Sequence, residues 1–154
     1  ALRGYPDLET YGRGHQVVVA DGRVPAWRAG TFGAVVADVP CTGLGSLRRR
    51  PESRWRRDAE QVDELTGLQA GLLASAIEST RPGGVVAYIT CSPHPAETVD
   101  VVAAASGVEL LDAPALLPEV PDAASRLNPR CIQLWPHIHG TDAMFCALLR
   151  RSGR

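Results

Sequence analysis

Two stretches of the sequence decide the fold: FGAVVAD (Phe32–Asp38) and GVVAYITC (Gly84–Cys91). Each is a short, nearly continuous apolar run that ends in a polar side chain, as is typical of a strand buried on both faces. The sequence between them predicts a helix that begins near Asp58 and ends at RPGG (81–84). Its apolar positions recur at helical spacing: Leu65, Leu68, Leu72 and Ala76. A strand, a crossover helix and a second strand predict two adjacent parallel strands of an open α/β fold.

The rest of the chain continues this alternation of strands and helices. QVVVAD (Gln16–Asp21) and MFCALLR (Met144–Arg150) are predicted to be strands, and Pro95 to Ala105 a helix with proline in its first turn. VELLDA (108–113) is also predicted to be a strand, and the proline-rich stretch 114–129 a loop. We therefore expect a parallel sheet that is covered by helices on both faces.

The composition indicates one globular domain, since the chain has 154 residues, of which 45% are hydrophobic and 21% charged. The 16 basic residues are all arginine, and against 17 acidic residues they leave a net charge of −1. Any attraction to nucleic acid must therefore come from a local cluster. The four cysteines form no CxxC pair, no apolar run approaches the ~20 residues of a membrane span, and the first residues lack a signal-peptide pattern. These features predict a reduced, cytoplasmic protein without a membrane partner.

Polar side chains follow the ends of the predicted strands. Asp21 ends the first run, Asp38 and Cys41 follow the second, and Cys91 ends the third. Because ligands of open α/β sheets bind outside the carboxyl ends of the strands, we expect Asp38, Cys41 and Cys91 to converge there. Two cysteines beside a carboxylate can perform nucleophilic chemistry if a thiol pKa is lowered. From position alone, the simpler interpretation is that Cys91 is a small buried residue that closes a strand.

Longer motifs surround the two cysteines: DVPCTGLGSLRRRPESRWRR (Asp38–Arg57) and YITCSPHPAET (Tyr88–Thr98). Together they resemble the Sun (Fmu, RsmB-like) family of RNA cytosine carbon-5 methyltransferases, which carries the first motif after one strand and Thr-Cys-Ser at the end of the next. ADGRVP (Ala20–Pro25) is similar to the family's cofactor-adenine segment. LWPHIHGTDAMFCALLRR (Leu134–Arg151) is similar to its C-terminal hairpin, although Ala143 stands where a glycine is usual.

The resemblance implies an α/β, Rossmann-like class I S-adenosylmethionine-dependent methyltransferase fold with the sheet order 3-2-1-4-5-7-6. Residues 1–154 would be the C-terminal part of the catalytic domain, truncated at its N-terminal side, with the first two strands missing. The strand Phe32–Asp38 would then become an exposed edge. We expect Gln16–Asp21 to pair with it directly, a second copy or the missing N-terminal portion of the chain to cover it, or the N-terminal segment to be displaced. Such a fragment would bind cofactor weakly and be inactive alone.

The resemblance also assigns roles at the strand ends. Cys91 would add to carbon 6 of cytosine, which makes carbon 5 nucleophilic toward the methyl group of S-adenosylmethionine. Asp38 would hydrogen-bond the ring nitrogen or the exocyclic amine, and Cys41 would assist elimination and product release. Asp21, Asp38 and Pro40 would contact the cofactor. The substrate implied is RNA, ribosomal RNA at the family level, and its target base must leave the stack to react.

Two alternatives stay open on the sequence. DNA cytosine methyltransferases use the cysteine of a Pro-Cys motif as nucleophile, which would make Cys41 the attacking residue and Cys91 structural. The chain could also be an RNA-binding fragment with no activity of its own, because the family's Gly-rich cofactor loop is not in it.

An arginine cluster follows the first cysteine, with six arginines within ten residues. Their forks suit phosphate contacts, and the tryptophan among them suits base stacking. The residues expected to bind RNA are Arg48, Arg49, Arg50, Arg54 and Trp55. The other interpretation is a solvated loop balanced by nearby acids, or internal pairing with acids of the following helix. His137 and His139 beside Asp142 lack further ligands at a useful spacing, so we expect no metal site.

Overall fold

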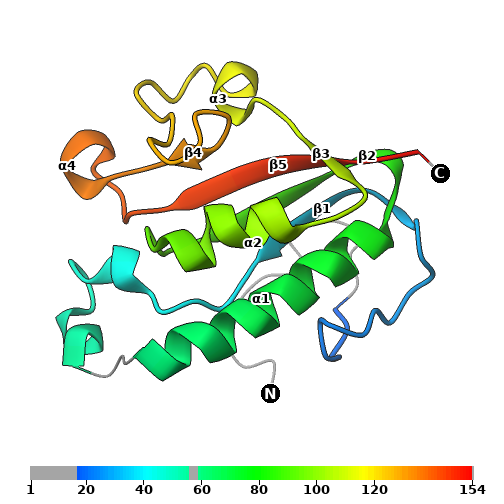
Figure 1. Ribbon diagram of the computed structural model, residues 1–154, viewed down its shortest axis with the longest axis horizontal. Coiled ribbons are helices and arrows are strands. Elements are labelled where there is room, and N and C mark those ends of the chain that lie inside the picture. The colour runs from blue at the N-terminus through cyan, green and yellow to red at the C-terminus, as the bar shows by residue number, and fades with distance from the viewer. Residues whose placement is uncertain (1–16, 56–58, 154) are drawn as a thin grey trace.

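The computed structural model describes residues 17–55 and 59–153, and these form one mixed α/β layer structure (Figure 1). The strands are β1 (Phe32–Asp38), β2 (Thr80–Thr90), β3 (Val108–Leu110), β4 (Ile132–Gln133) and β5 (Phe145–Arg151). The α-helices are α1 (Ala59–Ser79), α2 (Val99–Ala104), α3 (Ala113–Leu116) and α4 (Pro136–His139). Three short 3-10 turns complete the list: η2 (Leu44–Ser46), η3 (Pro51–Trp55) and η4 (Pro95–Glu97).

The sheet has the order β1-β2-β5-β3, and β4 pairs with β5 outside this path. This order is the one that the family resemblance predicts for the last four strands. β1 and β2 are parallel, as expected, but β5 is antiparallel to both β2 and β3. The prediction of an all-parallel sheet was therefore wrong. The reason is that β5 inserts between β2 and β3 in the opposite direction, and an antiparallel neighbour needs no crossover helix.

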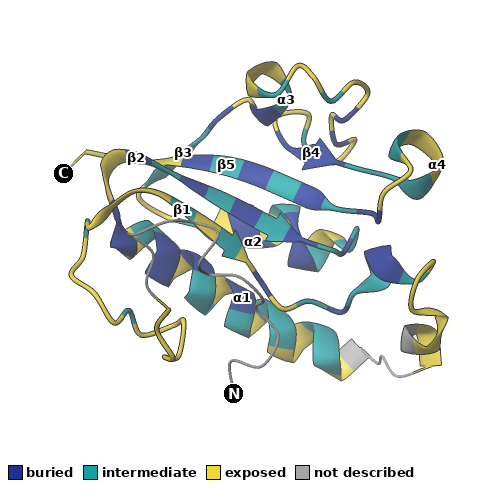
Figure 2. Cartoon of the chain, turned by 180° about the vertical axis from the view of Figure 1, so that it is seen from behind, coloured by how far each residue is buried: buried dark blue, intermediate teal, exposed yellow. Residues whose placement is uncertain are grey.

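One face of the sheet carries the main core. Leu73 and Ala76 of α1 and Val101 of α2 pack there with Tyr88 and Phe145. On the other face, the segment from α3 to β4 covers only the β5 side of the sheet, and its small cluster is built on Ala113, Ala123 and Ile132. The same face of β1 is bare, as Figure 2 shows in yellow, and Val36 is 68% exposed. The expected cover on both faces is thus present over only part of the sheet.

Helix α1 forms where the spacing predicts it, but its buried stripe is centred on Gln69, Leu73 and Ala76, whereas Leu65, Leu68 and Leu72 are only half-buried. A buried glutamine is tolerated because its amide is hydrogen-bonded, as described below. The helix ends at Ser79, before RPGG, where the hydroxyls of Ser79 and Thr80 donate to the carbonyls of Ser75 and Ala76. The predicted cap, Asp58, lies outside the described residues.

The predicted strand Gln16–Asp21 is wrong for the part that the structure describes, because residues 17–21 form no strand and are exposed. The chain that follows lies instead along α1: Trp27 Nε1 donates to Ser79 Oγ at 2.7 Å, and Gly30 N donates to the Glu78 carbonyl at 2.8 Å. Within the described residues, β1 pairs only with β2, so its other edge is free. Residues 17–21 are therefore displaced from β1 and do not pair with it directly.

The remaining elements differ from prediction in length. The helix predicted from Pro95 to Ala105 splits into η4 and α2, with Thr98 between them at φ −125° and ψ −98°. The strand predicted over 108–113 covers only Val108–Leu110. The first residues of the predicted loop 114–129 belong to helix α3 (Ala113–Leu116). Among the described helices, none combines the length and apolar character that crossing a bilayer requires.

Candidate active site

The two cysteine loops meet at the carboxyl ends of β1 and β2. The strands are in register up to Asp38 and Ile89, and Val39 N donates to the Ile89 carbonyl at 3.1 Å. The chains then turn toward each other, which brings Cys41 Sγ to 3.3 Å from Cys91 Sγ. The convergence that the strand order predicts is therefore present.

Both thiols open into a hollow of 320 Å³. Its wall is formed by nine residues: Asp38, Val39, Pro40, Cys41, Thr42, Gly43, Ser46, Arg50 and Cys91. Cys41 and Cys91 are half-buried, while Asp38 and Pro40 are exposed. A small planar ring placed in this hollow would meet two sulfur atoms, a carboxylate and a guanidinium group.

The sulfur pair distinguishes the two cysteines electrostatically. The hydrogen bond from the Cys41 thiol lowers the pKa of Cys91 to about 7, although burial and the charges of Asp38 and Asp142 oppose this shift. The same contact with Cys91, together with burial, raises the pKa of Cys41 well above its usual range. A hydrogen bond between the two sulfur atoms favours one thiolate beside one protonated thiol, and the lowered pKa of Cys91 favours Cys91 as the thiolate.

A three-way backbone junction holds Cys91 in place. Gly45 N donates to the Cys91 carbonyl, and Ala143 N donates to the Gly45 carbonyl, both at 2.9 Å. A Cβ at position 45 would lie 2.8 Å from the Cys91 carbonyl oxygen and closer still to that of Ala143. Only glycine lets these three segments approach so closely, which gives the second glycine of the Thr-Gly-Leu-Gly sequence a steric role.

The arginine cluster divides into an inward and an outward part. Arg49 forms an ion pair with Asp142, with Nε 3.0 Å from both carboxylate oxygens, and Asp142 is only 8% exposed. Arg49 therefore pairs with the C-terminal segment and not with the helix that follows it. Hydrogen bonding to Arg49 holds the pKa of Asp142 below its usual value. Arg48 reaches the Gly140 carbonyl at 3.3 Å, and Arg50 lines the hollow.

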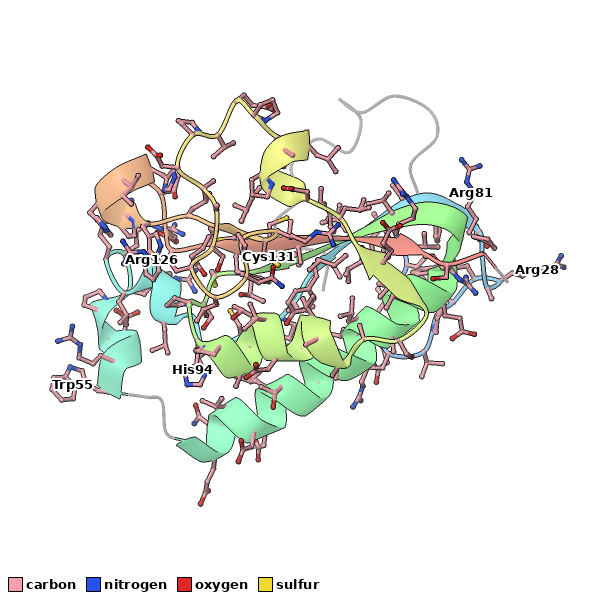
Figure 3. All side chains as sticks on the ribbon, turned by 45° about the horizontal axis from the view of Figure 1, so that its top comes forward. Arg28, Trp55, Arg81, His94, Arg126 and Cys131 are labelled. Atoms are coloured by element: carbon pink, nitrogen blue, oxygen red, sulfur yellow. The ribbon has the colours of Figure 1, made fainter. Side chains whose placement is uncertain are left out.

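Trp55 and Arg54 face outward. Trp55 is 85% exposed, and Figure 3 shows its ring standing away from the body of the protein, at the end opposite to Arg28. His94, which caps η4, lies at the same end as Trp55 (Figure 3). A large apolar ring that is held in solvent beside arginines offers a stacking surface.

The expected cofactor residues lie apart from one another. Asp38 and Pro40 line the hollow, whereas Asp21 does not. Both carboxylate oxygens of Asp21 accept hydrogen bonds from Arg23, which lower its pKa to about 2. Gly22, the next residue, lines a second hollow of 250 Å³ with Asp38 along the free edge of β1. The exposed carboxylate of Asp38 fits a cofactor that bears hydrogen-bond donors, and Asp21 would first have to release Arg23.

The histidines of the C-terminal segment are engaged in local structure. His139 Nδ1 accepts from Trp135 N at 3.0 Å, and its other ring nitrogen lies 3.1 Å from the Pro121 carbonyl. The ring of His137 lies against Trp135, with the ring centroids 6.2 Å apart. In the described parts of the chain, His, Cys, Asp and Glu side chains form no group of three that could hold a metal ion.

A buried polar cluster that the sequence does not predict lies directly behind the cysteines. Glu97, Thr42, Ser92 and Gln69 are all buried and hydrogen-bonded to one another. Three of them stand inside or next to the quoted motifs, but neither spacing nor hydropathy predicts that a glutamate will be buried. Its position shortly after the second cysteine, in a turn that begins with proline, is the one available signal.

Comparison with known proteins identifies the family. Residues 8–150 match the family described as 16S rRNA methyltransferase RsmB/F. The chain belongs to this family. The match spans both cysteine motifs and β5, so the resemblance seen in the sequence is confirmed.

Individual relatives agree with this assignment. Rv1407 of Mycobacterium tuberculosis, a protein named as a methyltransferase, is 57% identical over 123 residues, which are 78% of this chain and 26% of that protein. Ribosomal RNA small subunit methyltransferase B of Sodalis glossinidius is 39% identical over 128 residues, covering 81% of this chain and 29% of its own. The chain thus spans between a quarter and a third of the length of these relatives.

A solved structure supports the fold. NSun6 from Pyrococcus horikoshii, solved with the S-adenosylmethionine analogue SFG, superposes with a TM-score of 0.65 at 26% identity. The superposition covers 77% of this chain and 30% of NSun6. The mixed α/β fold of the described residues is thus similar to part of this neighbour and is consistent with a truncated Rossmann-like methyltransferase fold.

Proposed function

We propose that this chain is the part of an RNA methyltransferase that carries the catalytic cysteines, and that the reaction methylates carbon 5 of cytosine in ribosomal RNA. The observation that carries the proposal is the pair of sulfur atoms 3.3 Å apart, open to a hollow that Asp38 also lines. The RsmB/F family match supports ribosomal RNA as the substrate class.

Cys91 is the proposed nucleophile, because it is the thiol of the pair whose pKa is lowered to about 7. Its thiolate adds to carbon 6 of the cytosine ring, and the displaced electron pair makes carbon 5 nucleophilic. Asp38, at the rim of the same hollow, hydrogen-bonds the ring nitrogen or the exocyclic amine and stabilises the charge that develops. Carbon 5 would then accept the methyl group of S-adenosylmethionine, with cleavage of the methyl–sulfur bond and S-adenosylhomocysteine as the leaving group.

Cys41 is the proposed helper in product release. When a water molecule in the solvent-open hollow takes the proton from carbon 5, the electrons of that C–H bond restore the ring double bond, and the bond from carbon 6 to Cys91 breaks. The Cys41 thiol lies 3.3 Å from the Cys91 sulfur, a position from which it can donate a hydrogen bond and stabilise the thiolate that leaves. The raised pKa of Cys41 supports a role as proton donor over a role as the attacking thiolate of the DNA-type arrangement.

S-adenosylmethionine supplies the methyl group when it is bound. Asp38 and Pro40 are the residues of this chain that line the side of the hollow next to β1, and Asp21 is the proposed contact to the adenine. Arg48, Arg49, Arg50, Arg54 and Trp55 are the proposed RNA surface, although Arg49 already pairs with Asp142. The exposed ring of Trp55 supports stacking against a base, and the small hollow supports entry of a single base that has left its stack.

We further propose that the 154 residues alone bind cofactor weakly and do not methylate RNA. Among the described residues, the edge of β1 that faces away from β2 has no partner strand, and Asp38 at its end is exposed to solvent. A cofactor bound beside Asp38 would therefore contact protein on one side only, which supports weak binding. Calorimetric titration of the isolated chain with S-adenosylmethionine should give weak binding, and micromolar affinity would contradict the proposal.

The cysteine roles are tested in the full-length protein with RNA and S-adenosylmethionine. Cys91→Ala should abolish both methyl transfer and the covalent RNA adduct seen on a denaturing gel. Cys41→Ala should let the adduct accumulate, and Cys146→Ala, which alters a cysteine away from the hollow, should leave transfer unchanged. Methyl transfer by the Cys91→Ala variant would overturn the assignment, and loss of the adduct in Cys41→Ala would support the DNA-type arrangement.

A further inference from the structure

Glu97 is a carboxylate in the interior of the protein, with no solvent exposure. A buried carboxylate costs several kcal/mol unless it is paired or fully hydrogen-bonded. In the part of the chain that the structure describes, no arginine or histidine forms an ion pair with it. Glu97 is stabilised instead by four hydrogen-bond donors, and the positions of these donors indicate the role of the carboxylate.

Three of these donors come from the two cysteine loops, and the fourth comes from α1. Oε1 accepts from Thr42 N at 2.8 Å and from Gln69 Nε2 at 3.1 Å. Oε2 accepts from Thr42 Oγ1 and from Ser92 Oγ, each at 2.5 Å. Thr42 directly follows Cys41, and Ser92 directly follows Cys91. One carboxylate therefore bridges the residues that come immediately after the two thiols.

The bridge is anchored on both sides of the site. Tyr88 of β2 donates its hydroxyl to the Glu97 carbonyl at 2.8 Å, which fixes the backbone that carries the carboxylate. Gln69 of α1 also donates to the Pro40 carbonyl at 2.9 Å, directly before Cys41. Glu97 is thus held rigidly against the sheet and α1, and the two loops are held against Glu97.

The carboxylate stays charged in this position. Burial alone would raise the pKa of Glu97, but the hydrogen bonds from Ser92, Thr42 and Gln69 outweigh it and keep the pKa below its usual value. A charged acceptor binds hydroxyl and amide donors more strongly than a neutral one. The charge therefore strengthens the bridge between the loops.

We propose that Glu97 is a positioning residue that sets the distance between Cys41 and Cys91 by clamping the loops that carry them. This inference rests on the proposed function, in which the contact between the two thiols prepares Cys91 for attack. Glu97 does not line the hollow and has no route to the substrate, so it acts only through Thr42 and Ser92.

If Glu97 holds the two cysteine loops together, neutralising its carboxylate should change the pH at which the Cys91 thiol ionises. Glu97→Gln keeps the shape but replaces one charged acceptor by an NH₂ group, which weakens the hold on both loops. The Cys41 thiol then donates less well to Cys91, and the midpoint of Cys91 ionisation rises. A rise of one pH unit from about 7 lowers the thiolate fraction at pH 7 from about one half to about one tenth, so alkylation slows about five-fold.

The experiment measures the rate of Cys91 alkylation by iodoacetamide against pH in the full-length protein, with the modified peptide quantified by mass spectrometry. The groups that face Cys91 are the same in every variant: Cys41, Asp38, Asp142 and Arg49. Glu97→Gln should raise the midpoint by about one unit. Leu73→Ala is the control, because it destabilises the same core without touching either cysteine loop, and it should leave the midpoint unchanged.

A second variant keeps the test decisive if Glu97→Gln does not fold. Thr42→Val combined with Ser92→Ala removes both hydroxyl donors to Oε2 and should raise the midpoint in the same direction. With RNA, kcat should fall while KM for RNA and for S-adenosylmethionine stays within two-fold. A midpoint that stays at the wild-type value in the folded variants would overturn the positioning role. Because alkylation needs no RNA, this result is independent of whether methyl transfer to cytosine occurs.

Discussion

Gly45→Ala is the substitution for which the structure predicts the largest local effect. The added Cβ would lie 2.8 Å from the Cys91 carbonyl oxygen and even nearer to the Ala143 carbonyl oxygen. Both neighbours are backbone atoms, one at the end of β2 and the other just before β5, so neither can rotate out of the way. One of the three segments therefore has to move.

The cost has two parts. Overpacking of a well-packed site costs about 1–3 kcal/mol. Moving the segments apart also weakens the bonds from Gly45 N to Cys91 and from Ala143 N to Gly45, each worth about 1 kcal/mol. The free energy of unfolding should therefore fall by about 3–5 kcal/mol, a large share of the ~5–15 kcal/mol of an ordinary domain.

Equilibrium urea unfolding of the full-length protein measures this loss. Gly67→Ala is the matched control, because position 67 lies within α1 with nothing near its added Cβ. There the same change should stabilise the protein by about 1 kcal/mol through helix propensity. A Gly45→Ala variant that unfolds within 1 kcal/mol of the wild type would refute the reasoning about the junction.

Further predictions concern the charges around the hollow. Alkylation of Cys91 should rise through pH 7, because its pKa is about 7, and Cys41→Ala should move the midpoint above pH 8 by removing the donor; an unchanged profile would contradict the sulfur contact. Arg49→Ala should speed amide hydrogen exchange at Ala143, since the ion pair to Asp142 holds that segment, whereas protection equal to the wild type would show that the pair is dispensable. Arg54→Ala should leave that exchange unchanged and reduce the slope of log RNA affinity against log salt by about 1, and a slope that does not change would exclude a phosphate contact.

The sequence predicted the elements whose identity depends on local pattern and on immediate neighbours. β1 has the predicted bounds because its apolar run is bordered by Gly30 on one side and by Asp38, with Pro40 two residues later, on the other. Its adjacency to β2 follows from the crossover rule. Residues 17–21 carry a similar apolar run but form no strand. A strand requires a partner edge, and apolar periodicity does not supply one.

The parts of the site that were not predicted depend on distant contacts. Arg49 meets Asp142 because η2 and the turn before β5 lie together at the junction, which no local pattern encodes. Glu97 is buried because four donor groups converge on it, and these come from three residues on other elements or turns: Thr42, which supplies two, Gln69 and Ser92. The proximity of the two cysteines could be predicted because each follows the carboxyl end of one of two adjacent parallel strands. This prediction needs only the order of the strands in the sheet.

The most direct measurement uses RNA that carries 5-fluorocytidine at the target position, since fluorine on carbon 5 cannot leave as the proton does and the enzyme remains attached. The full-length protein is incubated with this RNA and S-adenosylmethionine, digested, and the peptide that bears the nucleotide is identified by mass spectrometry. The mass of the modified nucleotide should be found on the Thr-Cys-Ser peptide, at Cys91. Attachment at Cys41, or recovery of both cysteine peptides unmodified while methyl transfer proceeds on ordinary RNA, would contradict the account.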